Sequence, residues 1–132
     1  MSTSLSLQTL DKLPKSVAIP RYSRRSLKPG IVHIGVGNFH RAHLGVYLDD
    51  LFNLGLDHDW AIVGAGVMPS DAKMREALAP QDYLSTIVEQ DNEVSAARIT
   101  GPMIDFIPPG DTAALIARLA DPAIRIVSLT VT

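Results

Sequence analysis

The chain has 132 residues, of which 46% are hydrophobic and 20% are charged, and its net charge at pH 7 is −2. This length suits one domain with a substantial core, and the composition excludes a disordered or fibrous chain. The nearly neutral charge gives no reason to expect a nucleic-acid partner, and no apolar run reaches the roughly 18 residues that a membrane-spanning helix needs. The absence of cysteine excludes disulfides and thiolate metal sites.

The amino-terminal segment 1–30 is expected to form an arm. Prolines interrupt it three times, and its basic cluster at 21–28 is poorly suited to a core. Leucines spaced by three predict a short helix over 6–13, and Pro29-Gly30 is a turn signal ahead of the first strand. The start of the chain lacks the basic region and continuous apolar stretch of a secretion signal, so the cytoplasm is the expected location.

The segment 31–43, IVHIGVGNFHRAH, predicts a buried strand, a glycine turn and the start of a helix. Many proteins hold the pyrophosphate of a dinucleotide at such a turn. Gly35 would permit the tight turn, Gly37 would let the backbone approach the phosphate, and the helix would supply N–H groups and positive dipole charge. His40 stands where the usual fingerprint has its third glycine, so the motif alone is a weak signal.

A helix is expected over 39–54, because Tyr47 and several leucines lie on one stripe while Asp49, Asp50 and Asn53 lie off it. A second buried strand is expected over 60–67. Strand, helix and strand together predict a right-handed βαβ unit, the smallest piece of a parallel sheet.

Asp71 follows the second strand, where dinucleotide folds place the acidic residue that binds the adenosine ribose. A carboxylate there would accept from the ribose 2′-hydroxyl and repel a 2′-phosphate, which favours NAD over NADP, although Lys73 and Arg75 are close enough to weaken that preference. Ser70 or Asp71 could instead cap the helix expected at 69–79. From spacing alone the two interpretations are equally supported.

The remainder predicts a hairpin of strands 83–89 and 93–99, a helix over 111–119 and a last strand over 124–132, while 103–107 is ambiguous. In the helix, Leu115, Ile116 and Leu119 are expected to face inward. Because the sequence stops inside an aliphatic run, we expect an amino-terminal piece of a longer protein. The predicted fold is α/β: a Rossmann-like, doubly wound, mainly parallel sheet with an inserted β-hairpin, occupying residues 31–132 and incomplete at its carboxyl end.

His33, His40 and His43 raise the question of a metal site, since two of them are three residues apart on one helix. No cysteine and no His-Glu-x-x-His pattern accompany them, so polar groups near a ligand are the favoured interpretation. Arg41 could pair with a phosphate or be a solvated residue of the first helical turn, and we slightly favour the second. No nucleophile is paired with a base, so no catalytic residue is assigned.

Four segments together resemble the amino-terminal domain of the mannitol dehydrogenase family, which comprises long-chain, zinc-independent polyol and hexuronate dehydrogenases. They are HIGVGNFHRAH at 33–43, DWAIVGAGV at 59–67, APQDYL at 79–84 and IRIVSLTVT at 124–132. The resemblance covers nearly the whole chain in order. It also explains His40, because the family pattern has histidine where other dinucleotide folds have glycine.

The resemblance implies an NAD-dependent enzyme that interconverts a sugar alcohol and a ketose by hydride transfer, with D-mannitol and D-fructose as the expected pair. The catalytic lysine of such enzymes lies in a second, helical domain, which here would follow Thr132. The implied cofactor-binding residues are those of the glycine turn and one acid: Ile34, Gly35, Val36, Gly37, Asn38, Phe39, His40, Arg41 and Asp71.

Alternatives stay open within and outside this family. A fructuronate or tagaturonate reductase would share this domain, because most substrate contacts would come from the second one. A non-catalytic module that senses NAD could use the same fold, and a glycine turn can serve packing alone. For the complete protein we expect a small-molecule polyol or ketose partner, no metal, no nucleic acid or membrane partner, and a monomer or small oligomer.

Overall fold

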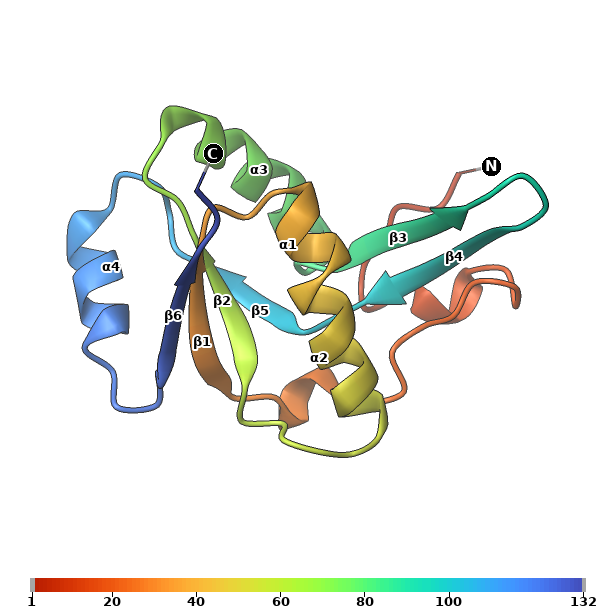
Figure 1. The fold of residues 1–132 in the computed structure, drawn as a ribbon, viewed down its shortest axis with the longest axis horizontal. Helices are drawn as coiled ribbons and strands as arrows, with labels where there is room; N and C mark the ends of the chain where they lie inside the picture. Colours follow the sequence, from red (N-terminus) through yellow and green to blue (C-terminus); the bar gives the residue numbers. More distant parts are fainter. Residues whose placement is uncertain (1, 132) are drawn as a thin grey trace.

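The computed structural model describes residues 2–131 and contains a four-stranded parallel sheet with helices on both faces (Figure 1). In the order β5-β2-β1-β6, its strands are β5 (Met103–Phe106), β2 (Ala61–Ala65), β1 (Pro29–Ile34) and β6 (Ile126–Leu129). The chain runs outward from β1 through β2 to β5 and then returns to the other side of β1. The strand order therefore reverses between β1 and β6, which confirms the predicted Rossmann-like, doubly wound fold.

The helices are α1 (Asn38–Ala42), α2 (Leu44–Asn53), α3 (Pro69–Leu78) and α4 (Thr112–Leu119), and short 3₁₀ turns occupy Leu10–Lys12, Arg24–Ser26 and Ala79–Gln81. The predicted hairpin is confirmed as the antiparallel pair β3 (Ser85–Gln90) and β4 (Ser95–Thr100), which projects from the sheet (Figure 1). Within residues 2–131, no helix combines the length and apolarity that crossing a membrane requires.

The core has two layers, one on each face of the sheet. Successive residues of β1 alternate between them: Ile31 packs with α2 and α3, whereas Val32 packs with α4. The first layer is completed by buried residues of the arm, helices and strands: Leu27, Leu48, Phe52, Ile62, Leu78, Met103 and Phe106. The segment 103–107, which was ambiguous in the sequence, thus supplies the edge strand β5 of the parallel sheet and part of the core.

The helix predicted over 39–54 is wrong in one respect, because two helices occupy this segment. His43 separates them with φ −117° and ψ −85°, which is not helical backbone. The predicted faces also need correction, since Tyr47 is 65% exposed and Asp49 only 1% exposed. The helical period places Asp49 off the apolar stripe, but polar partners from distant segments cover it.

Asp49 connects three parts of the molecule that are far apart in sequence. Its carboxylate accepts hydrogen bonds from the hydroxyl of Tyr22 in the arm, from the guanidinium of Arg98 on β4, and from the backbone N–H of Gly101 at 3.1 Å. Asn53, one turn later on α2, adds a fourth bond at 3.2 Å. The arm and the hairpin are therefore fastened to α2 through one buried carboxylate.

Three expectations for the arm are wrong. The helix over 6–13 is reduced to the 3₁₀ turn Leu10–Lys12, and Pro29 pairs with Ala61 inside β1 rather than turning ahead of it. Arg24 from the basic cluster enters the interior, where its guanidinium donates to the carbonyl oxygens of Asp82 at 2.9 Å and Met103 at 2.8 Å. Two backbone acceptors thus accommodate a charge that composition alone assigns to the surface.

The helix predicted at 111–119 is confirmed as α4, with Asp111 as its N-cap and the Ala114 N–H donating to the Asp111 carboxylate at 2.9 Å. Its predicted apolar face is only partly correct. Leu115 packs against the sheet, whereas Ile116 is 61% exposed and Leu119 is 37% exposed. Ala114 and Leu115 are therefore the hydrophobic residues of α4 that pack on this face of the sheet.

Two histidine rings join α1 to β1. His33 on β1 and His40 on α1 stack with their centroids 3.6 Å apart and their planes 10° apart, and both side chains are buried. Burial, then the neighbouring His33 and Arg41, lower the pKa of His40 to about 3. Burial also lowers the pKa of His33. The fold therefore favours two neutral rings at this contact.

This depressed pKa predicts a pH-dependent stability. Below the ordinary histidine pKa of about 6.5, the unfolded chain binds a proton at residue 40 that the folded chain does not. His40 by itself should therefore make the free energy of unfolding fall by about 1.4 kcal/mol for each pH unit as the pH drops from 6.5 toward 3. Urea unfolding at several pH values should show this slope. In His40→Asn the slope of unfolding free energy against pH should be smaller by the contribution of about one bound proton. In the surface control His43→Asn the slope should be unchanged.

The buried carboxylate predicts a second difference in stability. Asp49→Asn should lower the free energy of unfolding by about 3 kcal/mol, because Arg98 then loses its buried partner. Asp50→Asn removes the other, 58% exposed partner of the same arginine and should cost less than about 1 kcal/mol. Urea unfolding of the two variants measures both values. Equal losses would show that Asp49 is not the fastening point.

Candidate nucleotide-binding site

Gly35 forms the turn at the carboxyl end of β1. Its φ is +96°, a left-handed conformation that favours glycine, and its N–H donates to the Ala65 carbonyl at 3.0 Å. A Cβ at this position would lie 2.9 Å from the Thr130 carbonyl oxygen. Backbone conformation and space both require glycine here, as the sequence motif predicts.

Gly37 differs from Gly35 in both respects. It precedes α1 with φ −122° and ψ −168°, an extended conformation that any residue can adopt, and an added Cβ would meet no atom within 4 Å among the described residues. The protein's own packing therefore does not require glycine at residue 37. Open space over a glycine at a helix N-terminus is what a closely approaching phosphate needs.

Arg41 braces this turn from the first helical turn of α1. Its Nε donates to the Gly37 carbonyl at 3.3 Å, and its Nη2 donates to the Asn38 side-chain oxygen at 2.6 Å. Phe39 points outward, is 66% exposed, and stacks on His43 with ring centroids 4.3 Å apart. Arg41 therefore links Gly37 to Asn38, and Phe39 leaves an aromatic surface exposed to solvent next to them in the chain.

The other residues predicted around the turn hold it in place. The Ile34 carbonyl accepts from the N–H of Thr130 at 3.0 Å, and Val36 is 3% exposed in the core. The His33 ring lies within hydrogen-bond distance of the Ser128 hydroxyl at 2.7 Å, the Thr130 hydroxyl at 3.0 Å and the Gly35 carbonyl at 3.2 Å. His40 covers this ring from the helix side. His33, absent from the predicted set, thus supports the turn directly.

Asp71 lies at the carboxyl end of β2, the strand next to the glycine turn. Its carboxylate accepts from the Met68 N–H at 2.8 Å and so stabilises the start of α3, as the capping interpretation predicts. Its side chain also lies against Gly66, where an added Cβ would be 2.2 Å from the Asp71 Cβ. Gly66 follows Ala65, which accepts from Gly35, so the structure brings the acid and the turn to one edge of the sheet.

A small hollow beside Asp71 was not predicted from the sequence. The hollow has a volume of about 110 Å³. It lies between the ends of β2 and β5 and the start of α4. Ala65 and Gly66 form one wall, and the others come from the following loop and α4: Val67, Ile107, Pro108, Gly110, Asp111, Thr112 and Leu115. Assigning 103–107 as a strand would have indicated it, because the carboxyl ends of parallel strands meet at one edge.

The three histidines near the turn do not converge on one point. His33 and His40 stack face to face, and His43 lies outside them with its Nδ1 2.8 Å from the Phe39 carbonyl oxygen. Among residues 2–131, no group of three histidine, aspartate or glutamate side chains is arranged to hold a metal ion. The histidines serve packing and backbone support in this structure.

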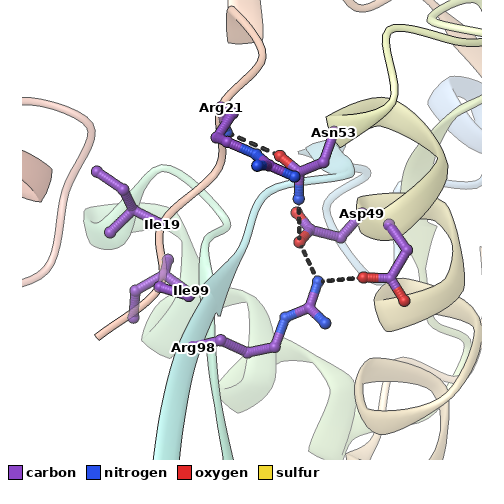
Figure 2. A pocket seen from close by; sticks show the side chains of 8 residues that line it. Ile19, Arg21, Asp49, Asn53, Arg98 and Ile99 are labelled. Carbon is purple, nitrogen blue, oxygen red and sulfur yellow. Dashed lines mark hydrogen bonds and ion pairs between the residues drawn. The ribbon is translucent and has the colours of Figure 1, made fainter. Parts of the chain in front are cut away.

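A larger hollow lies elsewhere, where the arm, α2 and β4 meet. Figure 2 shows Arg98 reaching from β4 to the carboxylates of α2 across this hollow of about 520 Å³. Its two carboxylates are already paired, since Arg98 contacts both Asp49 and Asp50. Because no residue of the glycine turn lines this hollow, it is not the candidate nucleotide site.

Comparison with known proteins agrees with this geometry. The family model described as the mannitol dehydrogenase Rossmann domain matches residues 29–132. A mannitol 2-dehydrogenase of Cereibacter sphaeroides is 64% identical over 121 residues, covering 91% of this chain and 25% of the relative. One from Pyricularia oryzae is 48% identical over 119 residues, covering 89% of this chain and 24% of the relative. The chain therefore spans about a quarter of the length of these curated relatives.

Two solved structures have the same fold. A ternary complex of Pseudomonas fluorescens mannitol 2-dehydrogenase with NAD and D-mannitol has a TM-score of 0.91 and 46% identity, over 96% of this chain and 26% of that one. A substrate-free D-sorbitol dehydrogenase has a TM-score of 0.85 and 40% identity, over 96% of this chain and 27% of that one. The fold, the glycine turn and the family match lead to one conclusion: the chain belongs to the mannitol dehydrogenase family, and residues 29–132 match its Rossmann domain.

Proposed function

We propose that this chain is the cofactor-binding part of an NAD-dependent dehydrogenase that interconverts a sugar alcohol and a ketose by hydride transfer. The observation that carries the proposal is the open, extended Gly37 at the start of α1, on the same sheet edge as Asp71. D-mannitol and D-fructose are the proposed pair, supported by relatives named mannitol 2-dehydrogenase and by a structural neighbour that holds NAD and D-mannitol.

In this proposal each part of the site binds one part of NAD. The first N–H groups of α1 and the open space over Gly37 receive the pyrophosphate, with Asn38 and Arg41 at its side. Asp71 accepts from the adenosine ribose, and the hollow bounded by Gly66 and Ile107 takes the adenine. The nicotinamide supplies the hydride chemistry. In this chain, the turn that receives the pyrophosphate is shaped and supported by Ile34, Val36, Phe39 and His40.

Four matters stay predictions: the polyol or ketose substrate, the oligomeric state, the cytoplasmic location, and the division into an arm of residues 1–30 and a domain of residues 31–132. The second candidate within the family is a fructuronate or tagaturonate reductase. The candidate from another class is a non-catalytic module that senses NAD. Oxidation of D-mannitol, but not of hexonates, by the complete protein would support the first proposal, and NADH binding without turnover of any polyol or hexonate would favour the sensing module.

The two glycines of the turn allow a matched test. Gly37→Ala should change the free energy of unfolding by less than about 0.5 kcal/mol, because its backbone and surroundings accept a methyl group. It should nevertheless weaken NADH binding at least about tenfold, because the methyl group would occupy the phosphate's place. Gly35→Ala should lose about 2 kcal/mol of stability through its positive φ. NADH fluorescence titration and urea unfolding measure both effects. Unchanged NADH affinity in Gly37→Ala would contradict the phosphate assignment.

Asp71→Asn tests the ribose contact. Losing a charged hydrogen bond should weaken NADH binding about tenfold. The affinity for NADPH should fall less or should rise, because the carboxylate no longer repels the 2′-phosphate. The control is Asp91→Asn in the hairpin turn, where the carboxylate likewise accepts backbone N–H groups, from Glu93 and Val94 at 2.7 Å. A variant that is less stable but binds both cofactors as before would show that Asp71 acts only as a cap.

A further inference from the structure

His40 is a buried polar side chain without a protein partner. It is 2% exposed, and within residues 2–131 neither of its ring nitrogens has a hydrogen-bond partner. Leaving such a group unsatisfied destabilises the folded state, and buried polar groups in folded proteins nearly always have a partner. The stack on His33 uses the face of the ring and leaves both nitrogens, which lie at its edge, without a bond.

A small cavity lies beside this ring, between α1 and the base of the hairpin. Ser85 on β3 and Thr100 on β4 line it together with His40, and these two residues face each other as register partners. Both are buried, at 6% and 2% exposure. The volume open to the centre of a water molecule is about 10 Å³. That is about the space of one water molecule, and it is too small for any part of a dinucleotide or sugar.

The chemistry of the lining distinguishes water from an ion. None of the residues that line the cavity carries a carboxylate, and Arg41 is one of them, so the lining offers a cation no negative partner. The volume excludes phosphate and other polyatomic anions. An imidazole edge and two hydroxyl groups match the two to four hydrogen bonds that an internal water makes.

We propose that this cavity is an internal hydration site, in which one water molecule bridges the His40 ring to the hydroxyl groups of Ser85 and Thr100. The water donates to the unprotonated ring nitrogen and exchanges hydrogen bonds with the hydroxyls. It thereby satisfies a ring nitrogen of His40 and joins α1 to the β3–β4 hairpin. His40 is then a positioning residue, because its ring covers His33, which contacts the Gly35 carbonyl and the Thr130 hydroxyl.

The test uses the complete protein with nitrogen-15 in its histidine rings. In Ser85→Ala and Thr100→Val, the ring resonances of His40 should shift, because the water loses a partner. In the control Ser95→Ala, an exposed serine of the same hairpin, they should not. All variants are compared at equal folded fraction, measured by circular dichroism. Unshifted His40 resonances in both cavity variants would overturn the proposal.

A high-resolution crystal structure provides the second measurement. A water molecule within hydrogen-bond distance of a His40 ring nitrogen and of both hydroxyls is expected in the wild-type protein, and it should be lost or displaced in Thr100→Val. A dry cavity, or a His40 ring bonded directly to a protein group, would overturn the proposal. The result does not depend on cofactor identity, since every group involved belongs to this chain.

Discussion

The carboxyl end of β1 is held from both sides, and the geometry of the glycine turn depends on this constraint. On one side the Gly35 N–H donates to the carbonyl of Ala65 on β2, and on the other the Thr130 N–H donates to the Ile34 carbonyl. The turn is thus positioned by two strands that lie about 30 and about 95 residues further along the chain. Removing either neighbour would release one side of the turn, so the local glycine motif needs the completed sheet to hold its geometry.

The histidine at residue 40 changes how α1 packs on the sheet. In other dinucleotide folds the third glycine lets the helix approach the strand closely. Here an imidazole from α1 lies flat on an imidazole from β1, 3.6 Å away, so an aromatic contact replaces that backbone approach. The helix then breaks at His43, and α2, which contains Asp49, follows α1 along the same side of the sheet (Figure 1). The departure from the common motif is therefore matched by a second histidine, His33, on the facing strand.

The features that could be predicted from the sequence are those that a short segment determines by itself. Apolar runs predict the strands, Asp91-Asn92 predicts the hairpin turn, and the Gly-x-Gly spacing predicts the position of the glycine turn, although the sheet is needed to hold its geometry. Asp49 could not be predicted as buried, because Tyr22 and Arg98, which satisfy it, lie 27 and 49 residues away. The hollow beside Asp71 was missed for a related reason: one of its walls follows β5, whose segment is too short to classify by period.

Asp71 shows that the two interpretations of one residue are compatible. Capping uses one carboxylate oxygen, which accepts the Met68 N–H at 2.8 Å, and a carboxylate has several further acceptor sites. Gly66 allows the side chain to lie on the end of β2, because any Cβ there would overlap it. The cap and the missing Cβ together fix the acid in one orientation before a ligand arrives, which lowers the entropy lost on binding. The capping bond is therefore compatible with the ribose contact that we propose for Asp71, and it would orient the carboxylate for that contact.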